Sequence, residues 1–304
     1  MCTCPLPARR VNGQIEFLGR TPSGRFVSNA LATLQIPCGQ CVECRLKRSR
    51  EWAIRCLHEA SLHRDNCFVT LTYKDAPVSL DYGHYQAFMK RLRARFPRDT
   101  IRFYACGEYG ETNPRTGLKD GGLYRPHFHA CLFGFNFPDR KPVRLLGQSD
   151  LFSSEVLNAT WGHGHCTIGN VTFESAAYVA RYIMGKVTGD LAKAHYMLIT
   201  EDGEMIERVP EMCKMSLRPG IGHDWFRRFS SDVFPRDEVI ARGKATQPPR
   251  YYDKLLSRLD EAMAEAVAAA REREGRTRAA DHTDKRNAVR DVVIKAGIRS
   301  LIRD

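Results

Sequence analysis

The stretch HFHACLFG at residues 127–134 constrains the fold most, because it contains no charged residue and repeats every second position. In a β-strand successive side chains point to opposite faces. One face would carry His127, His129, Cys131 and Phe133. The other would carry Phe128, Ala130 and Leu132. The pattern predicts a strand with one face buried against helices and two imidazoles on the opposite face.

Other segments extend this strand into a sheet. Three runs rich in β-branched and aromatic residues predict further strands, at residues 67–73, 101–108 and 166–171. The Gly- and Pro-rich residues 110–126 predict a long hairpin loop before residue 127. Helical spacing predicts helices at 85–96, capped by Asp81, and at 174–187. This order predicts an α+β fold: an antiparallel sheet with helices on one face.

The two ends of the chain differ from this middle part. Residues 1–40 contain scattered Pro and Gly and predict irregular structure, followed by a helix at 42–63. Beyond residue 250 the composition shifts to Ala, Glu, Arg and Asp, which predicts a charged helical tail. We therefore expect three parts: a Cys-rich segment with the first helix at 1–63, an α+β domain at 64–250 and the tail at 251–304.

The net charge narrows the choice of partner. Lys plus Arg is 47 and Asp plus Glu is 35, a surplus of +12 that favours capture of polyanions. Nucleic acid is the first candidate and an anionic membrane surface the second, while a basic protein without either partner stays open. No run approaches the roughly 18 apolar residues of a membrane span, and the first residues lack a signal-peptide layout. We expect a chain that is neither membrane-spanning nor exported.

Eleven cysteines are a high count for a chain expected in a reducing compartment, so disulfides are not expected. Five of them gather in two short motifs: Cys2, Cys4, Cys38, Cys41 and Cys44. Two-residue spacing lets thiolates converge on one ion, and four of the five would complete a structural zinc site. A loop-to-helix junction that binds nothing and an iron–sulfur cluster remain open alternatives.

A second candidate metal site joins the two predicted middle strands. Glu108 ends residues 101–108, so a hairpin would place it beside His127, with Glu111 as the substitute. Two histidines and a carboxylate with open positions suit Mn²⁺ or Mg²⁺ acting on a phosphate. Alone, a His-x-His pair is more often structural, and the Gly-flanked pair His163 and His165 predicts a turn.

Tyrosines line one face of the helix predicted at 174–187. Tyr178, Tyr182 and Lys186 lie four residues apart and therefore stack on one face. Tyrosines at this spacing usually serve packing, but a basic neighbour and a candidate metal site favour chemistry here. A tyrosine hydroxyl, with a pKa of about 10, becomes a nucleophile only when a neighbour helps to remove its proton.

These pieces, in this order, resemble the HUH superfamily of rolling-circle replication initiators. The shared marks are the hydrophobic strand at 68–73, the His127-Phe128-His129 motif and the tyrosine helix. The Tyr-Val-Ala-basic-Tyr pattern at 178–182 is similar to that of microvirus initiators. The motif at 37–45 and the stretch at 215–226 are similar to the gokushovirus branch, and the whole resemblance covers residues 36–230.

The resemblance implies a nick-and-rejoin enzyme on a ferredoxin-like or RRM-like sheet, with residues 64–250 as the endonuclease domain. His127, His129 and Glu108 would hold Mg²⁺ or Mn²⁺, and one tyrosine would form a 5′-phosphotyrosine while freeing a 3′-OH. The second tyrosine would act after one round of replication. Relatives often have Lys at position 181; Arg181 can hold a phosphate but is a poor proton exchanger, which shifts that role to Lys186.

The implied partners are single-stranded origin DNA and the host helicase and polymerase, in the cytoplasm of a bacterial host. Two alternatives stay open from the sequence. One is a non-catalytic, zinc-stabilised DNA-binding protein in which the histidines and tyrosines are structural. The other is an HUH relaxase or transposase, although no P-loop motif accompanies the tyrosines.

Overall fold

The computed structural model describes residues 2–20, 26–27, 31–110, 123–143, 151–181, 191–200 and 202–301. The chain forms two compact units, one of Met1–Arg48 with Ala264–Asp304 and one of Ser49–Met263. The boundaries fall inside α1 (Val42–Ala60) and α8 (Glu261–Thr277). The division expected from the sequence, at residues 63 and 250, stays a prediction.

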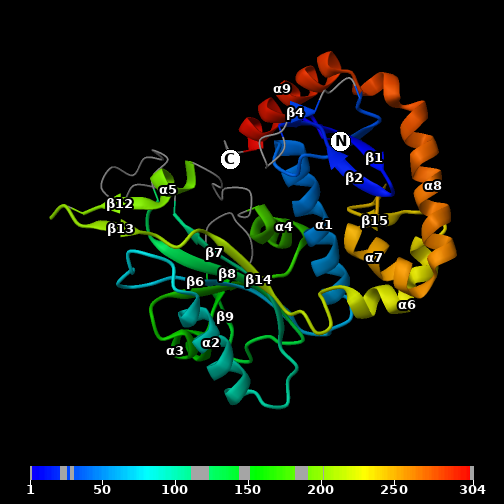
Figure 1. The fold of residues 1–304 in the computed structure, drawn as a ribbon. Helices are drawn as coiled ribbons and strands as arrows, with labels where there is room; N and C mark the ends of the chain where they lie inside the picture. Colours follow the sequence, from blue (N-terminus) through cyan, green and yellow to red (C-terminus); the bar gives the residue numbers. More distant parts are fainter. Residues whose placement is uncertain are drawn as a thin grey trace. The chain divides into compact units, whose positions relative to one another are not determined.

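The larger unit contains a seven-stranded sheet in the order β14-β7-β8-β6-β11-β10-β9, and neighbouring strands are antiparallel (Figure 1). The strands are β14 (Met212–Met215), β7 (Arg102–Tyr109), β8 (Pro126–Phe133), β6 (Asn66–Leu71), β11 (Cys166–Gly169), β10 (Leu151–Ser153) and β9 (Lys141–Val143). The predicted α+β class with an antiparallel sheet is confirmed. The four predicted strands correspond to β6, β7, β8 and β11, while β9, β10 and β14 are short additions at the edges.

Helices cover both faces of this sheet. On one face α2 (Tyr82–Arg95) and α3 (Glu155–Trp161) pack against alternate residues of β6, β7 and β8. On the other, α4 (Phe173–Arg181) and the α1 residues Ala53 and Cys56 do so (Figure 1). The sequence predicted helices on one face only. The second face is covered because its own β7 and β8 positions, among them Tyr104 and Phe133, are apolar and gain by burial.

Helix α2 begins where the sequence predicted. The Asp81 carboxylate accepts a hydrogen bond from the Gly83 backbone N–H at 2.7 Å, which satisfies one of the free donors of the first turn. Its apolar face is buried in the core of the sheet and consists of Tyr85, Phe88, Met89 and Leu92. The helix therefore fixes the face of the sheet opposite to the one that carries the histidines.

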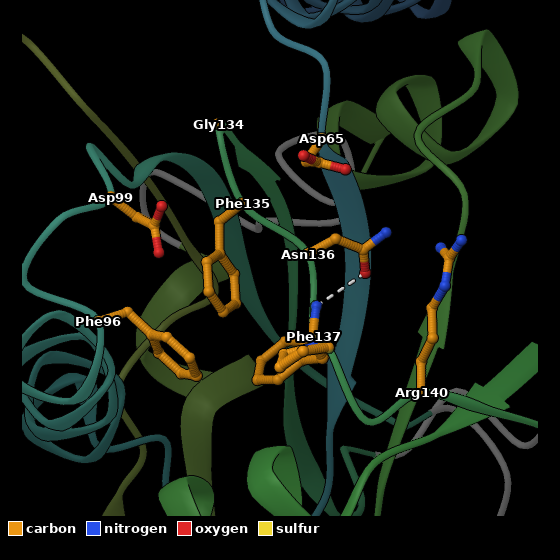
Figure 2. A pocket seen from close by; sticks show the side chains of 9 residues that line it. Asp65, Phe96, Asp99, Gly134, Phe135, Asn136, Phe137 and Arg140 are labelled. Atoms are coloured by element: carbon orange, nitrogen blue, oxygen red, sulfur yellow. Dashed lines mark hydrogen bonds between the residues drawn. The ribbon is translucent and has the colours of Figure 1, made fainter.

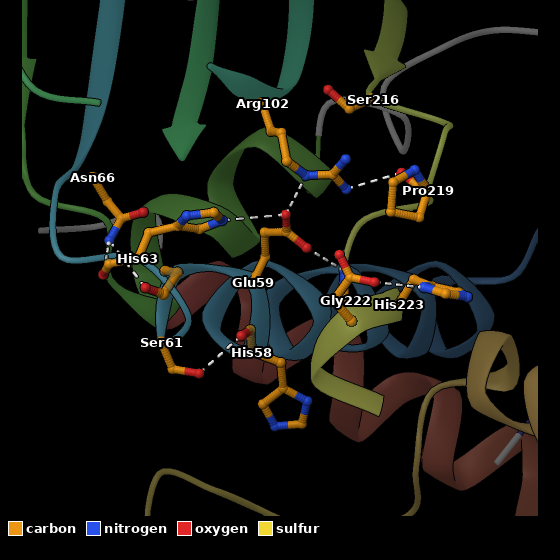
Figure 3. A network of polar contacts seen from close by, with 12 residues as sticks. His58, Glu59, Ser61, His63, Asn66, Arg102, Ser216, Pro219, Gly222 and His223 are labelled. Carbon is orange, nitrogen blue, oxygen red and sulfur yellow. Dashed lines mark hydrogen bonds and ion pairs between the residues drawn. The ribbon is translucent and has the colours of Figure 1, made fainter. Parts of the chain in front are cut away.

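The rest of the larger unit follows β11 and α4 in short elements. They are α5 (Leu191–Tyr196), β12 (Met197–Ile199), β13 (Met205–Glu207), α6 (His223–Val233), β15 (Val239–Ala241), β16 (Lys244–Thr246) and α7 (Arg250–Leu259). The stretch at 215–226 leads from β14 into α6, and a polar network around Glu59 of α1 holds it (Figure 3). The Glu59 carboxylate, only 3% exposed, accepts hydrogen bonds from Arg102 and, at 2.7 Å, from the Gly222 N–H.

Loss of the Glu59 carboxylate is expected to destabilise the fold strongly. Glu59→Ala would leave the buried guanidinium of Arg102 and the Gly222 N–H without their acceptor, at a cost of about 3 kcal/mol in the free energy of unfolding. The matched control is Glu155→Ala, because its pair with Lys141 is exposed and worth less than about 1 kcal/mol. Urea unfolding of both variants measures the difference, and equal losses would contradict a structural role for the network.

A buried histidine makes stability depend on pH. His58 of α1 stacks on Trp225 with ring centroids 3.5 Å apart, and its Nδ1 lies 2.8 Å from the Tyr252 hydroxyl. Burial lowers the pKa of His58 from 6.5 to about 4. Between these values the unfolded chain takes up a proton that the folded chain does not, so stability falls as the pH drops.

The expected loss from His58 at pH 5 is about 2 kcal/mol relative to pH 7.5. We expect His58→Gln to remove this part of the pH dependence, since glutamine does not titrate. The control variant is His165→Gln, whose side chain is exposed. Urea unfolding at both pH values measures the effect, and an unchanged pH dependence in His58→Gln would exclude His58 as its source.

The smaller unit contains strands that the sequence did not predict. In it β1 (Leu6–Val11) pairs with both β2 (Gln14–Phe17) and β5 (Leu34–Ile36) in an antiparallel sheet. The other elements are β3 (Gly19–Arg20), β4 (Phe26–Val27), the start of α1, most of α8, the 3₁₀ helix η3 (Ala279–His282) and α9 (Asp284–Leu301). The expected irregular start is therefore wrong, because Pro7 lies near the beginning of β1, where a strand tolerates proline.

The helical C-terminal segment is confirmed, although it breaks elsewhere than expected. One helix was expected at 255–274, and the structure has α7 and α8 with Asp260 between them. A polar linker was expected at 277–286, and the structure has η3 and the start of α9. No helix among the described residues is both long and apolar enough to cross a bilayer.

Candidate metal centre and tyrosine site

The register of three neighbouring strands brings the site together. Strands β7 and β8 pair Glu108 with His127 and Cys106 with His129, while β6 and β8 pair Thr70 with His129. Directly paired residues point to the same face of a sheet. Glu108, both histidines and Thr70 therefore share the face that α4 covers in part.

One carboxylate oxygen joins the two imidazoles. Glu108 Oε1 lies 2.7 Å from His127 Nε2 and 2.9 Å from His129 Nε2. Glu108 is 1% exposed and His129 is 6% exposed, while His127 is half-buried. The ligand atoms of the three side chains all lie within 4.8 Å of one another, close enough to hold one ion.

Hydrogen bonds on the far sides of the rings orient both histidines. His127 Nδ1 lies 3.0 Å from the Arg125 carbonyl oxygen, which can only accept, so Nδ1 carries the proton and donates it. Nε2 of a neutral ring then presents a lone pair toward Glu108, which is unfavourable without a positive charge. His129 Nδ1 lies 3.0 Å from the Thr70 hydroxyl. Such bonds on the second nitrogen are typical of histidines that bind metals through Nε2.

The two histidines respond differently to their surroundings. Burial lowers the pKa of His127, but the hydrogen bond and charge of Glu108, with the Arg125 carbonyl, outweigh burial and raise this pKa above its ordinary value. For His129, burial dominates and the pKa is lowered despite Glu108. The electrostatics of the site therefore favour one positive charge beside the carboxylate.

The donor atoms fit a divalent cation. The second carboxylate oxygen, Glu108 Oε2, is buried and has no hydrogen-bond partner among the described residues, which leaves it available as a ligand. Two imidazole nitrogens and a carboxylate leave further positions for oxygen ligands such as water or phosphate. A structural zinc ion would instead be enclosed by four protein ligands.

Helix α4 brings one predicted tyrosine to this centre. Thr172 and Ser175 exchange side-chain-to-backbone hydrogen bonds at its start, and Ala176, Val179 and Ala180 are buried against the sheet. Tyr178 is thereby directed at the histidines: its ring lies 5.0 Å from that of His129, nearly perpendicular to it. The Tyr178 hydroxyl donates a hydrogen bond to Glu108 Oε1 at 3.5 Å.

Other predicted residues of this site cannot be placed beside Tyr178. Tyr182, Lys186 and the substitute carboxylate Glu111 lie outside the described residues. Arg181 ends α4, but its side chain also lies outside the description. The second tyrosine, the basic pair and their roles therefore stay predictions.

Four of the five predicted cysteine ligands come together in the smaller unit. The thiols of Cys2, Cys38, Cys41 and Cys44 converge, whereas Cys4 is exposed. Burial alone would raise the pKa of Cys41, but hydrogen bonds from the backbone of Cys44 and from Thr3 lower it to about 6. The four thiols form a second candidate metal site.

The second His-x-His pair does not form such a site. His163 packs beside the rings of His84 and Trp161, and neither it nor His165 belongs to a group of three metal-ligating side chains among the described residues. Both lie in the connection between α3 and β11, where a Cβ on Gly164 would come within 2.4 Å of the Lys74 nitrogen. The glycine lets the two backbones approach, so this motif serves the fold.

A cavity of about 420 Å³ lies elsewhere in the larger unit (Figure 2). Its lining includes Asp65, Asp99, Arg140 and the residues that follow β8. His127 lies at the other end of β8, so the cavity is separate from the metal centre. Two carboxylates against one guanidinium make it a poor site for a phosphate.

Sequence reasoning missed two residues that shape the site. Thr70 shares the alternation of residues 67–73, so its position opposite the histidines could have been found once β6 and β8 were paired. Ser49 Oγ donates to the Ala177 carbonyl at 3.0 Å and holds α4 in place. This contact spans 128 residues, and no local pattern signals it.

Comparison with known proteins defines the class to which this fold and site belong. Residues 66–187, from β6 past α4, match the model of a family described as replication-associated protein ORF2. The chain is 32% identical over 243 residues to replication-associated protein VP4 of Bdellovibrio phage phiMH2K, covering 76% of this chain and 70% of that one. The chain thus belongs to the family of microvirus replication-associated proteins.

Two further relatives agree with this assignment. Replication-associated protein ORF2 of Spiroplasma virus 4 is 30% identical over 247 residues, which is 76% of this chain and 70% of that protein. Replication-associated protein ORF4 of Chlamydia phage 1 is 27% identical over 257 residues, which is 81% of this chain and 59% of that protein. No solved structure matches the chain.

Proposed function

We propose that this protein initiates viral DNA replication by nicking single-stranded origin DNA with a tyrosine nucleophile and a divalent ion. One observation carries the proposal. Glu108 Oε1 lies within hydrogen-bond reach of both histidine Nε2 atoms and 3.5 Å from the Tyr178 hydroxyl, in a chain of a replication-associated family. That family also favours a replication initiator over a relaxase or transposase.

Three side chains would hold the ion: His127, His129 and Glu108. Mg²⁺ or Mn²⁺ bound there supplies a Lewis acid that offsets negative charge on the scissile phosphate. The Arg125 carbonyl and the Thr70 hydroxyl keep both imidazoles turned inward, and this preorganisation lowers the cost of binding.

Tyr178 would act as the nucleophile. A bond forms between its Oη and the phosphorus, and the bond from phosphorus to the 3′ oxygen breaks. The tyrosine proton leaves toward a base while the 3′ oxygen gains a proton, which yields a 5′-phosphotyrosine and a free 3′-OH. Glu108 Oε1 accepts the hydrogen bond from this hydroxyl in the resting site, and Lys186 is the proposed proton acceptor.

Rejoining would be the reverse transfer. A 3′-OH attacks the phosphotyrosine, the bond from phosphorus to tyrosine breaks, and the phosphodiester is restored without a nucleotide cofactor. Tyr182 would make the second cut after one round, and Arg181 would hold the phosphate. Two alternating nucleophiles allow the enzyme to stay attached to the strand throughout.

The net charge of +12 supports single-stranded DNA as the partner, because cationic side chains release counterions from phosphates. The freed 3′-OH is a primer for the host polymerase, and the host helicase would open the template. These partners place the protein in the cytoplasm of the bacterial host.

The test uses oligonucleotides that tile both strands of the encoding viral genome, labelled at the 3′ end because that fragment would stay on the tyrosine. We expect a labelled protein band that survives denaturation in Mn²⁺ and maps to a peptide containing Tyr178 or Tyr182. Binding without an adduct or a nick across the whole set would overturn the proposal and favour the zinc-stabilised DNA-binding protein.

A further inference from the structure

We propose that Cys2, Cys38, Cys41 and Cys44 bind one structural zinc ion as four thiolates, and that Cys4 takes no part. These residues share no member with the Glu108 centre, so the inference stands independently of the proposed nicking activity. It rests on the spacing of the sulfurs, on the backbone around them and on the exposure of Cys4.

The distances between the sulfurs match a single tetrahedral ion. Zinc–sulfur bonds of about 2.3 Å at tetrahedral angles place the sulfurs about 3.8 Å apart. Cys2 Sγ lies 3.6 Å from Cys38 Sγ and 3.7 Å from Cys41 Sγ. The four sulfurs lie within 4.8 Å of one another, and the two measured separations far exceed a disulfide bond of about 2.05 Å.

The backbone around Cys38 is arranged to stabilise thiolates. Cys38 Sγ accepts hydrogen bonds from the N–H groups of Gln40 at 3.4 Å and Cys41 at 3.2 Å, and the Cys38 N–H donates to Cys2 Sγ at 3.3 Å. Gly39, at a φ of +74°, permits this tight turn. The turn leads into α1, whose first turn contains Cys44 and favours negative charge.

The spacing also selects among metals. In an iron–sulfur cluster each cysteine binds a different iron, so the cysteine sulfurs must stand farther apart than sulfurs that share one ion. Four soft thiolates in a tetrahedron suit zinc, and four protein ligands leave no open position for a substrate. The site is therefore structural and joins the residues before β1 to the start of α1.

Cys4 provides a matched control two residues from a ligand. Cys2 is buried, whereas Cys4 is exposed and its Sγ lies 3.8 Å from the Thr3 hydroxyl. The Thr3 hydroxyl in turn donates to Asp291 of α9 at 3.1 Å. Zinc would thus order a segment that also contacts the C-terminal helix of the same unit.

The first experiment measures metal in the purified full chain and in two variants. We expect Cys2→Ser to lose about one zinc per chain relative to the parent, and Cys4→Ser to lose none. Cobalt replacement identifies the ligands, because intense thiolate-to-cobalt absorption marks sulfur ligands and would be absent from a site of histidines and a carboxylate. Equal zinc loss in both variants, or iron with sulfide in the parent, would overturn the proposal.

The second experiment needs no variant and so avoids any failure to fold. Alkylation of the native, zinc-loaded parent followed by mass spectrometry should label Cys4 at least tenfold faster than the four ligands. A chelator should then expose those four to labelling. Equal labelling rates in the zinc-loaded chain would show that no ion protects the four thiols. Neither experiment uses DNA, so failure here is distinct from failure of the proposed nicking activity.

Discussion

The double variant Tyr178→Phe/Tyr182→Phe is expected to form no covalent adduct with DNA, a loss of at least about 10³-fold, because both proposed nucleophiles are gone. DNA binding should stay within about twofold of the parent, since phenylalanine removes only a hydroxyl and no positive charge. At position 178 the ring contacts with His129 and Phe68 can persist. A denaturing gel measures the adduct, and a filter-binding titration at one salt concentration measures the affinity.

The single variants test whether the tyrosines alternate. Each should retain one transfer step and lose the complete cycle of cutting and rejoining. Tyr251→Phe is the control, because Tyr251 stacks on Arg55 and contacts none of the proposed catalytic residues among the described part of the chain. An adduct of undiminished yield in the double variant would exclude both tyrosines, and two single variants with full turnover would argue against alternation.

The central sheet could be predicted because its signal is local. Residues 127–134 alternate strictly, and a one-residue slip would turn both histidines into the core on the other face. The hairpin between β7 and β8 then fixes Glu108 opposite His127. Geometry around the metal centre thus follows from two strands and one register.

The rest depended on contacts between distant residues. The apolar second face of β7 and β8 was visible in the sequence, but nothing local showed that α1 and α4 would cover it. Strands β1 and β5 each need a partner more than 20 residues away, and prolines near them hid their pattern. The choice of Cys2 over Cys4 likewise depends on how residues 2–5 fold against Cys38, which spacing alone does not determine.

His127→Ala is expected to abolish metal-dependent cleavage, with a loss of at least about 10²-fold in rate and a comparable loss in Mn²⁺ affinity. The variant removes one of three ligands and leaves Glu108 and His129 with too few donors to orient an ion. The loss should appear in Mn²⁺ titrations followed by electron paramagnetic resonance, which count bound ions without requiring cleavage.

The matched control for this histidine is His165→Ala, which removes an imidazole from the other His-x-His motif. His165 is exposed and its backbone carbonyl, which accepts from Thr72, is unchanged by the substitution. We expect parental Mn²⁺ affinity and cleavage in this control. Mn²⁺-dependent cleavage that survives His127→Ala would remove this histidine from the centre, because a ligand of the catalytic ion cannot be dispensable. A defect of equal size in His165→Ala would show that loss of an imidazole anywhere in the fold is enough, and the argument from the β7–β8 register would fail.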